Sequence, residues 1–409
     1  MDDQKRLRIQ VILFVVTILT TTASGAEWMY MYPPTSGMLS WAQILDGFQY
    51  SIPFLLILTC HEFGHYFTAR YHNIKVTLPY YIPFWFFGIF ISFGTMGAFI
   101  SIREKIESRT KYFDVGVAGP IAGFVVALVV IWYGFTHLPD REFIYEIHPE
   151  YEIMGDNYQA FYELDTVFLK SDLPNPNRAN YQHLPDTIVQ KSAESISIRP
   201  GSNLLYYLMQ EYVVEDASLM PHPNEIIHYP ILLVGYLALF FTALNLLPIG
   251  QLDGGHVIFS VFGERISRKI SAVMFTLFVF YAGLGVITPD LMKGGTPADT
   301  FWFAIQVLAY LYFLYICFTS MIESKRDRMM LAAIILAVQF VLASLFQVEG
   351  YYGWLLFSLL LGRFFGVYHP PVADNRPLST GRIIVAVLTL IIFILSFSPQ
   401  PLIFEIRGV

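Results

Sequence analysis

Two histidines and a glutamate occur at metal-ligand spacing in the segment HEFGH, residues 61–65. On a helix, His61 and His65 are four residues apart and share one face, so both imidazoles can bind one metal ion. Glu62 lies on the neighbouring face, where its carboxylate can take a proton from a metal-bound water. These residues predict a Zn²⁺ centre bound by His61 and His65, with Glu62 as the catalytic base.

The surrounding sequence strengthens this interpretation. Residues 51–60, SIPFLLILTC, carry no charge, and the apolar run around the motif is long enough to span a bilayer. Two histidines and a glutamate at that depth are costly unless they are paired or bind a metal. Cys60 precedes His61 but points away from the histidine face of the helix, so we interpret it as a packing residue.

A hydrolytic zinc site uses three protein ligands and leaves one position for water. The positions near HEFGH that supply a third ligand in soluble metalloproteases hold Thr68 and Tyr71 here, and no acidic residue lies between Glu62 and Glu104. The best distant candidate is Asp253, in NLLPIGQLDGGH, residues 245–256. It follows an apolar run that Pro248 and Gly250 interrupt, and a broken helix can direct a carboxylate inward. The alternative is that Asp253 only caps the next helix.

Composition indicates a protein that crosses a membrane several times. Of 409 residues, 55% are hydrophobic and only 14% are charged, whereas soluble domains are about a quarter charged. Two cysteines in apolar segments imply no disulfide framework, and a net charge of −7 gives no reason to expect a nucleic-acid partner. Apolar runs that reach or approach bilayer length fall at about 8–25, 46–70, 112–137, 229–249, 268–288, 299–322, 329–346, 350–366 and 382–399.

Residues 79–102 are also apolar but are rich in Pro, Gly and aromatic residues, which favours a re-entrant loop over a crossing helix. Lysine and arginine clusters flank many of the apolar runs. All of them fall on one side, with the N-terminus in the cytoplasm, if 79–102 enters and leaves by the same face. We therefore expect an all-α polytopic membrane protein of about eight or nine transmembrane helices, with a re-entrant loop or β-hairpin and one extracytoplasmic soluble insert.

The insert covers residues 138–228 and is acidic, with 15 Asp+Glu against 5 Lys+Arg. Its histidines, at 148, 183, 222 and 228, show no metal-ligand spacing, so we expect no second metal site there. The predicted organisation is an N-terminal anchor and loop at 1–45, the two halves of a catalytic core at 46–137 and 229–262 on either side of the insert, and additional C-terminal helices at 263–409.

Together, HEFGH and NLLPIGQLDGGH resemble the paired motifs of the site-2 protease family of intramembrane metalloproteases. Asn245, Pro248, Asp253 and Gly254 match that family's second motif at its full spacing. The small-residue stretch 117–124, VAGPIAGF, resembles a helix that the family places between the motifs. The stretch 93–100, FGTMGAFI, resembles the re-entrant β-hairpin of bacterial and plastid members. The resemblance covers roughly 46–137 and 229–262.

The resemblance implies peptide-bond hydrolysis within or near transmembrane segments of membrane-anchored proteins, with Zn²⁺ as cofactor. Asp253 is then the third ligand, and Asn245, Gly94, Thr95 and Gly97 are candidate substrate contacts. An unwound substrate could pair with 93–100 as an added strand. The alternatives are a membrane metal-ion transporter and an inactive relative that binds membrane proteins. We expect the bilayer and transmembrane proteins as partners and a bacterial inner membrane as location; the motifs predict no oligomeric state.

Overall fold

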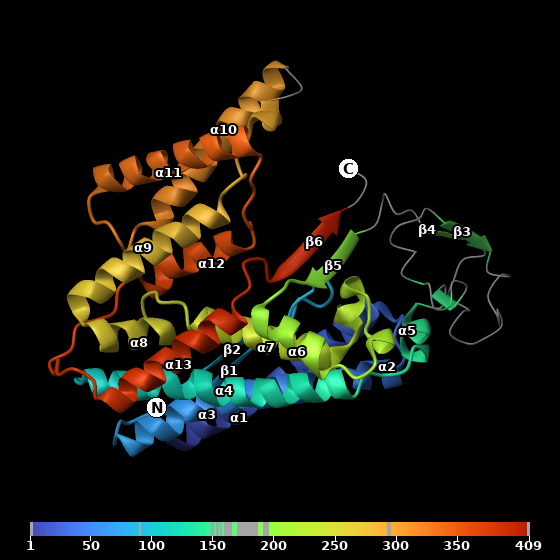
Figure 1. Ribbon diagram of the computed structural model, residues 1–409, viewed down its shortest axis with the longest axis horizontal. Coiled ribbons are helices and arrows are strands. Elements are labelled where there is room, and N and C mark those ends of the chain that lie inside the picture. Colours follow the sequence, from blue (N-terminus) through green and yellow to red (C-terminus); the bar gives the residue numbers. More distant parts are fainter. Residues whose placement is uncertain are drawn as a thin grey trace. The chain divides into compact units, whose positions relative to one another are not determined.

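The computed structural model describes residues 3–89, 91–148, 151, 152, 155, 158, 166–169, 187–190, 196–292 and 296–406. The described chain is mostly helical, with three small two-stranded antiparallel sheets (Figure 1). It forms two compact units. The first contains Met1–Arg103, Ile121–Ala243 and Ile394–Val409, and the second contains Glu104–Pro120 and Leu244–Phe393. Helix α4, Arg109–Thr136, begins in the second unit and ends in the first.

Two long helices form the base of the first unit, α1 at Asp3–Tyr30 and α3 at Phe48–Tyr71. They approach closely where small residues face each other. A side chain on Gly47 would collide with the carbonyl of Thr22, and the Thr21 and Ser51 hydroxyls share a buried hydrogen bond of 2.7 Å. Small residues that let helix backbones approach are typical of packing within membranes. The short helix α2, Trp41–Asp46, connects the pair and begins with a Ser40–Gln43 capping box.

A β-hairpin lies against these helices in the same unit. Strand β1, Tyr80–Phe84, pairs antiparallel with β2, Gly94–Phe99, and a bulge falls between Tyr81 and Pro83. The Tyr81 hydroxyl hydrogen-bonds the hydroxyl of Thr59 on α3 at 2.8 Å, two residues before HEFGH. The aromatic, Pro- and Gly-rich segment 79–102 is therefore a hairpin fastened beside the motif helix. That it enters a bilayer remains a proposal.

The remaining elements of the first unit include those of the insert. They are α5 (Glu142–Ile147), α6 (Leu204–Val213), the 3₁₀ turns η1 (Pro34–Ser36), η7 (Ala217–Leu219) and η8 (Pro223–His228), helix α7 (Pro230–Asn245), and the paired strands β3 (Thr166–Leu169) with β4 (Thr187–Gln190) and β5 (Ile196–Pro200) with β6 (Leu402–Ile406). The β5–β6 pair joins the end of the chain to the insert, and the buried Tyr236 hydroxyl of α7 donates to the carbonyl of Pro401 at 2.8 Å. Most of α7 is fully buried.

The second unit contains the later helices. These are α8 (Asp253–Phe262), α9 (Glu264–Ala282), α10 (Pro297–Cys317), α11 (Lys325–Phe346), α12 (Trp354–Leu360) and α13 (Thr380–Ser396), with the 3₁₀ turn η9 (Pro289–Met292) and the π-helical turn η10 (Leu361–Phe365). Helix α10 begins at a Thr296–Asp299 capping box with Pro297 in its first turn, and the Ser324 hydroxyl accepts from Asp327 N–H at the start of α11. These local signals set where the helices begin.

Five described helical segments are long and apolar enough to cross a bilayer: Asp3–Tyr30, Trp41–Tyr71, Arg109–Thr136, Pro297–Cys317 and Lys325–Phe346. Such helices are typical of an integral membrane protein. Three further apolar helices, Pro230–Asn245, Trp354–Phe365 and Thr380–Ser396, are shorter. Helix α9 begins with charged residues, so it presents a shorter apolar stretch than the predicted run at 268–288. A total of eight or nine spans therefore requires shorter helices to cross as well, and remains a prediction.

Candidate metal centre

His61 and His65 lie one turn apart on α3, with their Nε2 atoms 3.1 Å apart. Both side chains are buried, and their rings meet edge to face. With Zn–N distances of about 2.0–2.1 Å, two ligands of a tetrahedral zinc lie about 3.3 Å apart. The observed spacing therefore fits two imidazoles of one zinc site.

Glu62 is buried beside this pair, with only 6% of its surface exposed. It lies on α3 between the two histidines and so stays within reach of a group bound to them. Helix α4 packs against His61 at Gly123, where a Cβ atom would lie 3.1 Å from the His61 Cβ and 3.3 Å from its Nδ1. A side chain at this position would require a shift of a few tenths of an ångström.

The three hairpin residues predicted to contact substrate have different surroundings. Gly94 is buried against α1, where a Cβ would lie 2.4 Å from Thr21 Cα, and its carbonyl accepts from the Thr20 hydroxyl at 2.7 Å. Thr95 turns inward and donates to the carbonyl of Ile82 at 2.7 Å. Gly97, at φ 105°, has open space where a side chain would project. Within the described residues, β2 pairs only with β1, and the backbone N–H and carbonyl of Gly97 both bond the Thr95 hydroxyl, at 3.0 and 3.1 Å.

Asn245 and Asp253 both lie in the second unit, at the two ends of a helix break. Helix α7 ends at Asn245 and α8 begins at Asp253, so the interruption falls where Pro248 and Gly250 predict it. The connecting turn folds back tightly. A Cβ at Gly254 would lie 2.0 Å from the Leu246 carbonyl oxygen, and one at Gly255 would lie 2.3 Å from that of Gly250. The two glycines allow Asp253 to start a helix directly against the end of the preceding one.

The other end of α8 is closed by Arg109, which is buried in the same unit. Its guanidinium donates to the carbonyls of Ser260 at 2.6 and 3.1 Å, Val261 at 3.1 Å and Asn375 at 2.9 Å. The last carbonyls of a helix lack intrahelical partners and favour a nearby cation. Arg109 therefore fixes the helix that carries Asp253.

One turn beyond Asp253, His256 interacts with His369, in the loop between η10 and α13. Its Nδ1 lies 2.9 Å from His369 Nε2, and the His369 ring stacks on Phe259 at 3.8 Å. Asp374 in the same loop pairs with Arg376 at 2.8 Å and bonds through its backbone to Glu107 and Arg109. His369 and Asp374 thus connect this loop to α8 and to the start of α4 within the second unit.

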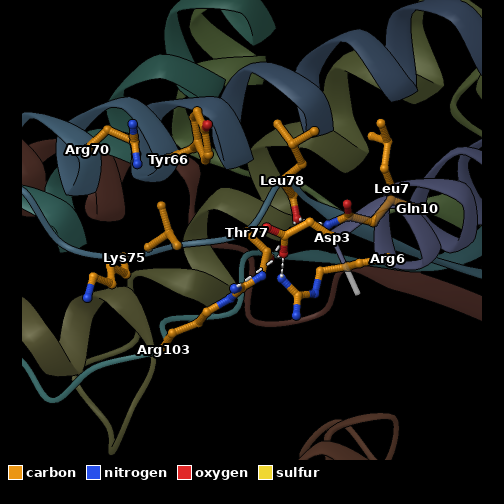
Figure 2. A pocket seen from close by; sticks show the side chains of 11 residues that line it. Asp3, Arg6, Leu7, Gln10, Tyr66, Arg70, Lys75, Thr77, Leu78 and Arg103 are labelled. Atoms are coloured by element: carbon orange, nitrogen blue, oxygen red, sulfur yellow. Dashed lines mark hydrogen bonds and ion pairs between the residues drawn. The ribbon is translucent and has the colours of Figure 1, made fainter. Parts of the chain in front are cut away.

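A polar pocket of about 320 Å³ opens in the first unit beside the end of α3 (Figure 2). Arg6, Arg70, Lys75 and Arg103 line it, with Tyr66, which directly follows HEFGH. Asp3 pairs with Arg6 at 2.9 Å and lies 3.8 Å from Arg103, as the dashed lines in Figure 2 indicate. Four cations around one pocket are typical of the cytoplasmic end of membrane helices.

The insert contains a grouping that the sequence analysis missed. His148 and His228, expected to be unrelated, have their Nε2 atoms 3.2 Å apart, and Glu225 lies beside both. The spacing of Glu225 and His228 could have predicted two of these three residues, because the side chains of residues i and i+3 lie on one face of a 3₁₀ helix. His222 instead caps η8 by accepting from Asn224 N–H, and His183 lies outside the described residues.

A membrane-spanning helix that carries two facing histidines and a glutamate, followed by a broken helix with an aspartate, is an arrangement typical of membrane metallopeptidases. The chain belongs to peptidase family M50, whose family model matches residues 49–288. This confirms the family predicted from the two motifs.

Among curated proteins, the chain is 25% identical over 288 residues to a probable zinc metalloprotease EGY2, chloroplastic, of Oryza sativa subsp. indica, covering 66% of this chain and 42% of the relative. It is 25% identical over 210 residues to the probable zinc metalloprotease EGY1, chloroplastic, of Arabidopsis thaliana, covering 51% of this chain and 28% of the relative. The chain thus spans less than half the length of these relatives. No solved structure matches it.

Proposed function

We propose that this protein is an intramembrane zinc endopeptidase that cleaves membrane-anchored proteins. The observation that carries the proposal is the buried pair of imidazoles, 3.1 Å apart, on a helix long enough to span a bilayer. Glu62 adjoins the pair, and membership of peptidase family M50 supports the same chemistry. Relatives named as probable zinc metalloproteases support Zn²⁺ as the cofactor.

Asp253 is the proposed third ligand, beside His61 and His65. Within the second unit, Asp253 stands at the start of α8, directly after the helix break, and Gly116 of α4 packs against its backbone. Two imidazoles and one carboxylate form a set typical of catalytic zinc.

Glu62 is the proposed general base. Bound zinc would polarise the scissile carbonyl and lower the pKa of a water to about 7. The Glu62 carboxylate accepts the proton of the attacking water and then delivers it to the leaving amine. Because Glu62 is buried, few solvent molecules can compete with it for the proton of the attacking water. Asn245, at the end of α7, is proposed to hydrogen-bond the substrate backbone or the developing oxyanion.

The proposed substrates are transmembrane segments that unwind locally, because a regular helix offers a protease no free backbone groups. Strand β2 is the proposed docking edge, since among the described residues it pairs only with β1, and the hairpin is bonded to the motif helix through Tyr81 and Thr59. Gly94 and Thr95 have inward contacts, so in this proposal they shape the hairpin while Gly97 permits the approach of substrate.

The proposed topology places the N-terminus and HEFGH toward the cytoplasmic face, with the hairpin re-entering from that face. The basic pocket beside Tyr66 supports this orientation and offers a polar approach for water near His65. The printed names of the relatives place those proteins in the chloroplast. The bacterial inner membrane stays a prediction.

The test is cleavage of a panel of single-span membrane proteins by purified protein in liposomes, with bound zinc measured on every sample. Glu62→Gln should retain all zinc and lose activity by about 10²–10⁴-fold, the range for removal of a general acid–base group. His61→Ala and Asp253→Ala should each lose one zinc per chain together with activity. Glu211→Gln, on the exposed surface of α6, is the matched control and should resemble wild type.

Each contrary result has a distinct meaning. If wild type and Glu62→Gln bind equal zinc and neither cleaves any substrate, the transporter or binding function is favoured. If His61→Ala retains as much zinc as wild type, the ligand assignment is wrong. If only Asp253→Ala retains zinc, the third ligand must be another residue.

A further inference from the structure

We propose that His148, Glu225 and His228 form a second divalent-metal site, suited to Zn²⁺, that closes the base of the insert. The three residues lie within the first unit and are separate from HEFGH in the sequence. His148 directly follows α5, near the start of the insert, and the other two belong to η8, at its end. A metal held here would join positions 80 residues apart in the chain.

The spacing of the three ligand atoms argues for a shared cation. His148 Nε2 and His228 Nε2 are 3.2 Å apart, and Glu225 Oε2 lies 3.6 Å from the first and 3.5 Å from the second. The carboxylate is too far from either nitrogen for a good hydrogen bond. Ligands of a tetrahedral zinc, at metal distances of about 2.0–2.2 Å, are instead about 3.3–3.5 Å apart. All three edges of the observed triangle are close to that value.

The outer contacts orient the ligands in the way metal sites require. His228 Nδ1 lies 2.5 Å from the carbonyl oxygen of Met29, which can only accept, so Nδ1 carries the proton and the Nε2 lone pair faces the triangle. The Tyr151 hydroxyl donates to Glu225 Oε1 at 2.8 Å, which leaves Oε2 toward the histidines. Such bonds to the far atoms of ligands hold first-shell residues in position.

Burial makes the arrangement costly without a cation. The side chains of Glu225 and His228 are 1% and 4% exposed, whereas His148 is 28% exposed and leaves an opening for a water ligand. A buried carboxylate is costly unless a charge compensates it. A divalent cation would neutralise Glu225 and satisfy both imidazoles.

The consequence is structural. The Met29 carbonyl belongs to the last turn of α1, so the site would fasten three segments together: the end of α1, the start of the insert and the turn before α7. Metal binding to such a preformed set stabilises the folded state, because the unfolded chain cannot assemble it. Two imidazoles, one carboxylate and an open position suit Zn²⁺ better than Mg²⁺ or Ca²⁺, which prefer oxygen ligands.

The experiment uses the full-length protein in detergent with His61→Ala and His65→Ala already introduced, so that the proposed catalytic site contributes no metal. After equilibration with buffered Zn²⁺, this background protein should hold one zinc per chain by elemental analysis. Adding His148→Ala with His228→Ala should abolish it. Adding His137→Ala, at an exposed histidine that follows α4, should not change it.

Two conservative variants keep the test decisive if the alanine variants fold poorly. Glu225→Gln retains the side-chain volume but loses the charge, and Tyr151→Phe removes only the orienting hydroxyl. We expect zinc affinity to fall at least about tenfold in each variant. The rise in melting temperature that zinc causes should become correspondingly smaller. The proposal is overturned if the background protein binds no zinc, or if it binds zinc that Glu225→Gln and the paired histidine variant leave unchanged.

Discussion

Removal of the Arg109 guanidinium should loosen the helix that carries Asp253. In Arg109→Met, the carbonyls of Ser260, Val261 and Asn375 lose their donor. Each buried unsatisfied acceptor costs about 1–3 kcal/mol. The Ser260 bonds are buried, whereas those to Val261 and Asn375 are partly exposed, so water can replace them in part. The net cost is therefore about 3–5 kcal/mol, which falls on α8 and the loop around Asn375.

Hydrogen exchange of the amides of residues 253–262 measures this loss directly. A cost of about 3–5 kcal/mol corresponds to exchange about 10²–10³ times faster or more, since about 1.4 kcal/mol is a factor of ten. Arg109→Lys should recover less than half of the lost free energy, because one ammonium group cannot replace a planar guanidinium that donates to three carbonyls. The control is Arg376→Met, at a side chain that is 85% exposed. If Arg109→Met changes the exchange of α8 no more than Arg376→Met does, Arg109 does not hold this helix.

Two glycine substitutions test how the helices and hairpin serve the proposed site. Gly123→Ala should lower zinc affinity about tenfold or more, because its Cβ displaces His61 by a few tenths of an ångström at a cost of about 1–3 kcal/mol. Zinc titration measures this, with Gly381→Ala, where space is open, as the control. Equal zinc affinities of the two variants would contradict the prediction. Gly97→Ala should retain zinc but reduce cleavage, because a side chain there obstructs the proposed substrate strand and strains a backbone at φ 105°. Gly94→Ala should lower the melting temperature, because its Cβ would collide with Thr21. Undiminished cleavage by Gly97→Ala would exclude that edge as the docking site.

The centre of the proposed site could be predicted because its geometry is local. His61 and His65 share a face on any helix, so the four-residue spacing alone implies facing imidazoles, and α3 places them 3.1 Å apart. The break before Asp253 is also local, since Pro248 removes a helical hydrogen bond and Gly250, two residues later, adopts φ 58°. The packing of Gly123 beneath His61 was only implied as a small-residue stretch, because which residue faces a ligand depends on how α4 crosses α3.

The limits of sequence reasoning appear in the span lengths and the hairpin. Hydropathy does not distinguish an apolar helix from an apolar turn that follows it. The predicted run at 229–249 therefore extends past the helix, which ends at Asn245. In the hairpin, Gly94 and Gly97 look equivalent by residue type. One is nevertheless buried against Thr21, and the other faces open space. Their difference arises from a β-bulge and from contact with α1, which no spacing rule contains.

The insert shows why spacing within a segment is too narrow a criterion for metal ligands. His148 has no partner nearby in sequence at a recognised interval, and its companion imidazole comes 80 residues later. The two ends of the insert meet because the start of α7 packs beside the end of α4, where a Cβ at Gly134 would lie 3.0 Å from Leu232. Ligands at its two ends are therefore close in space whatever the insert folds into.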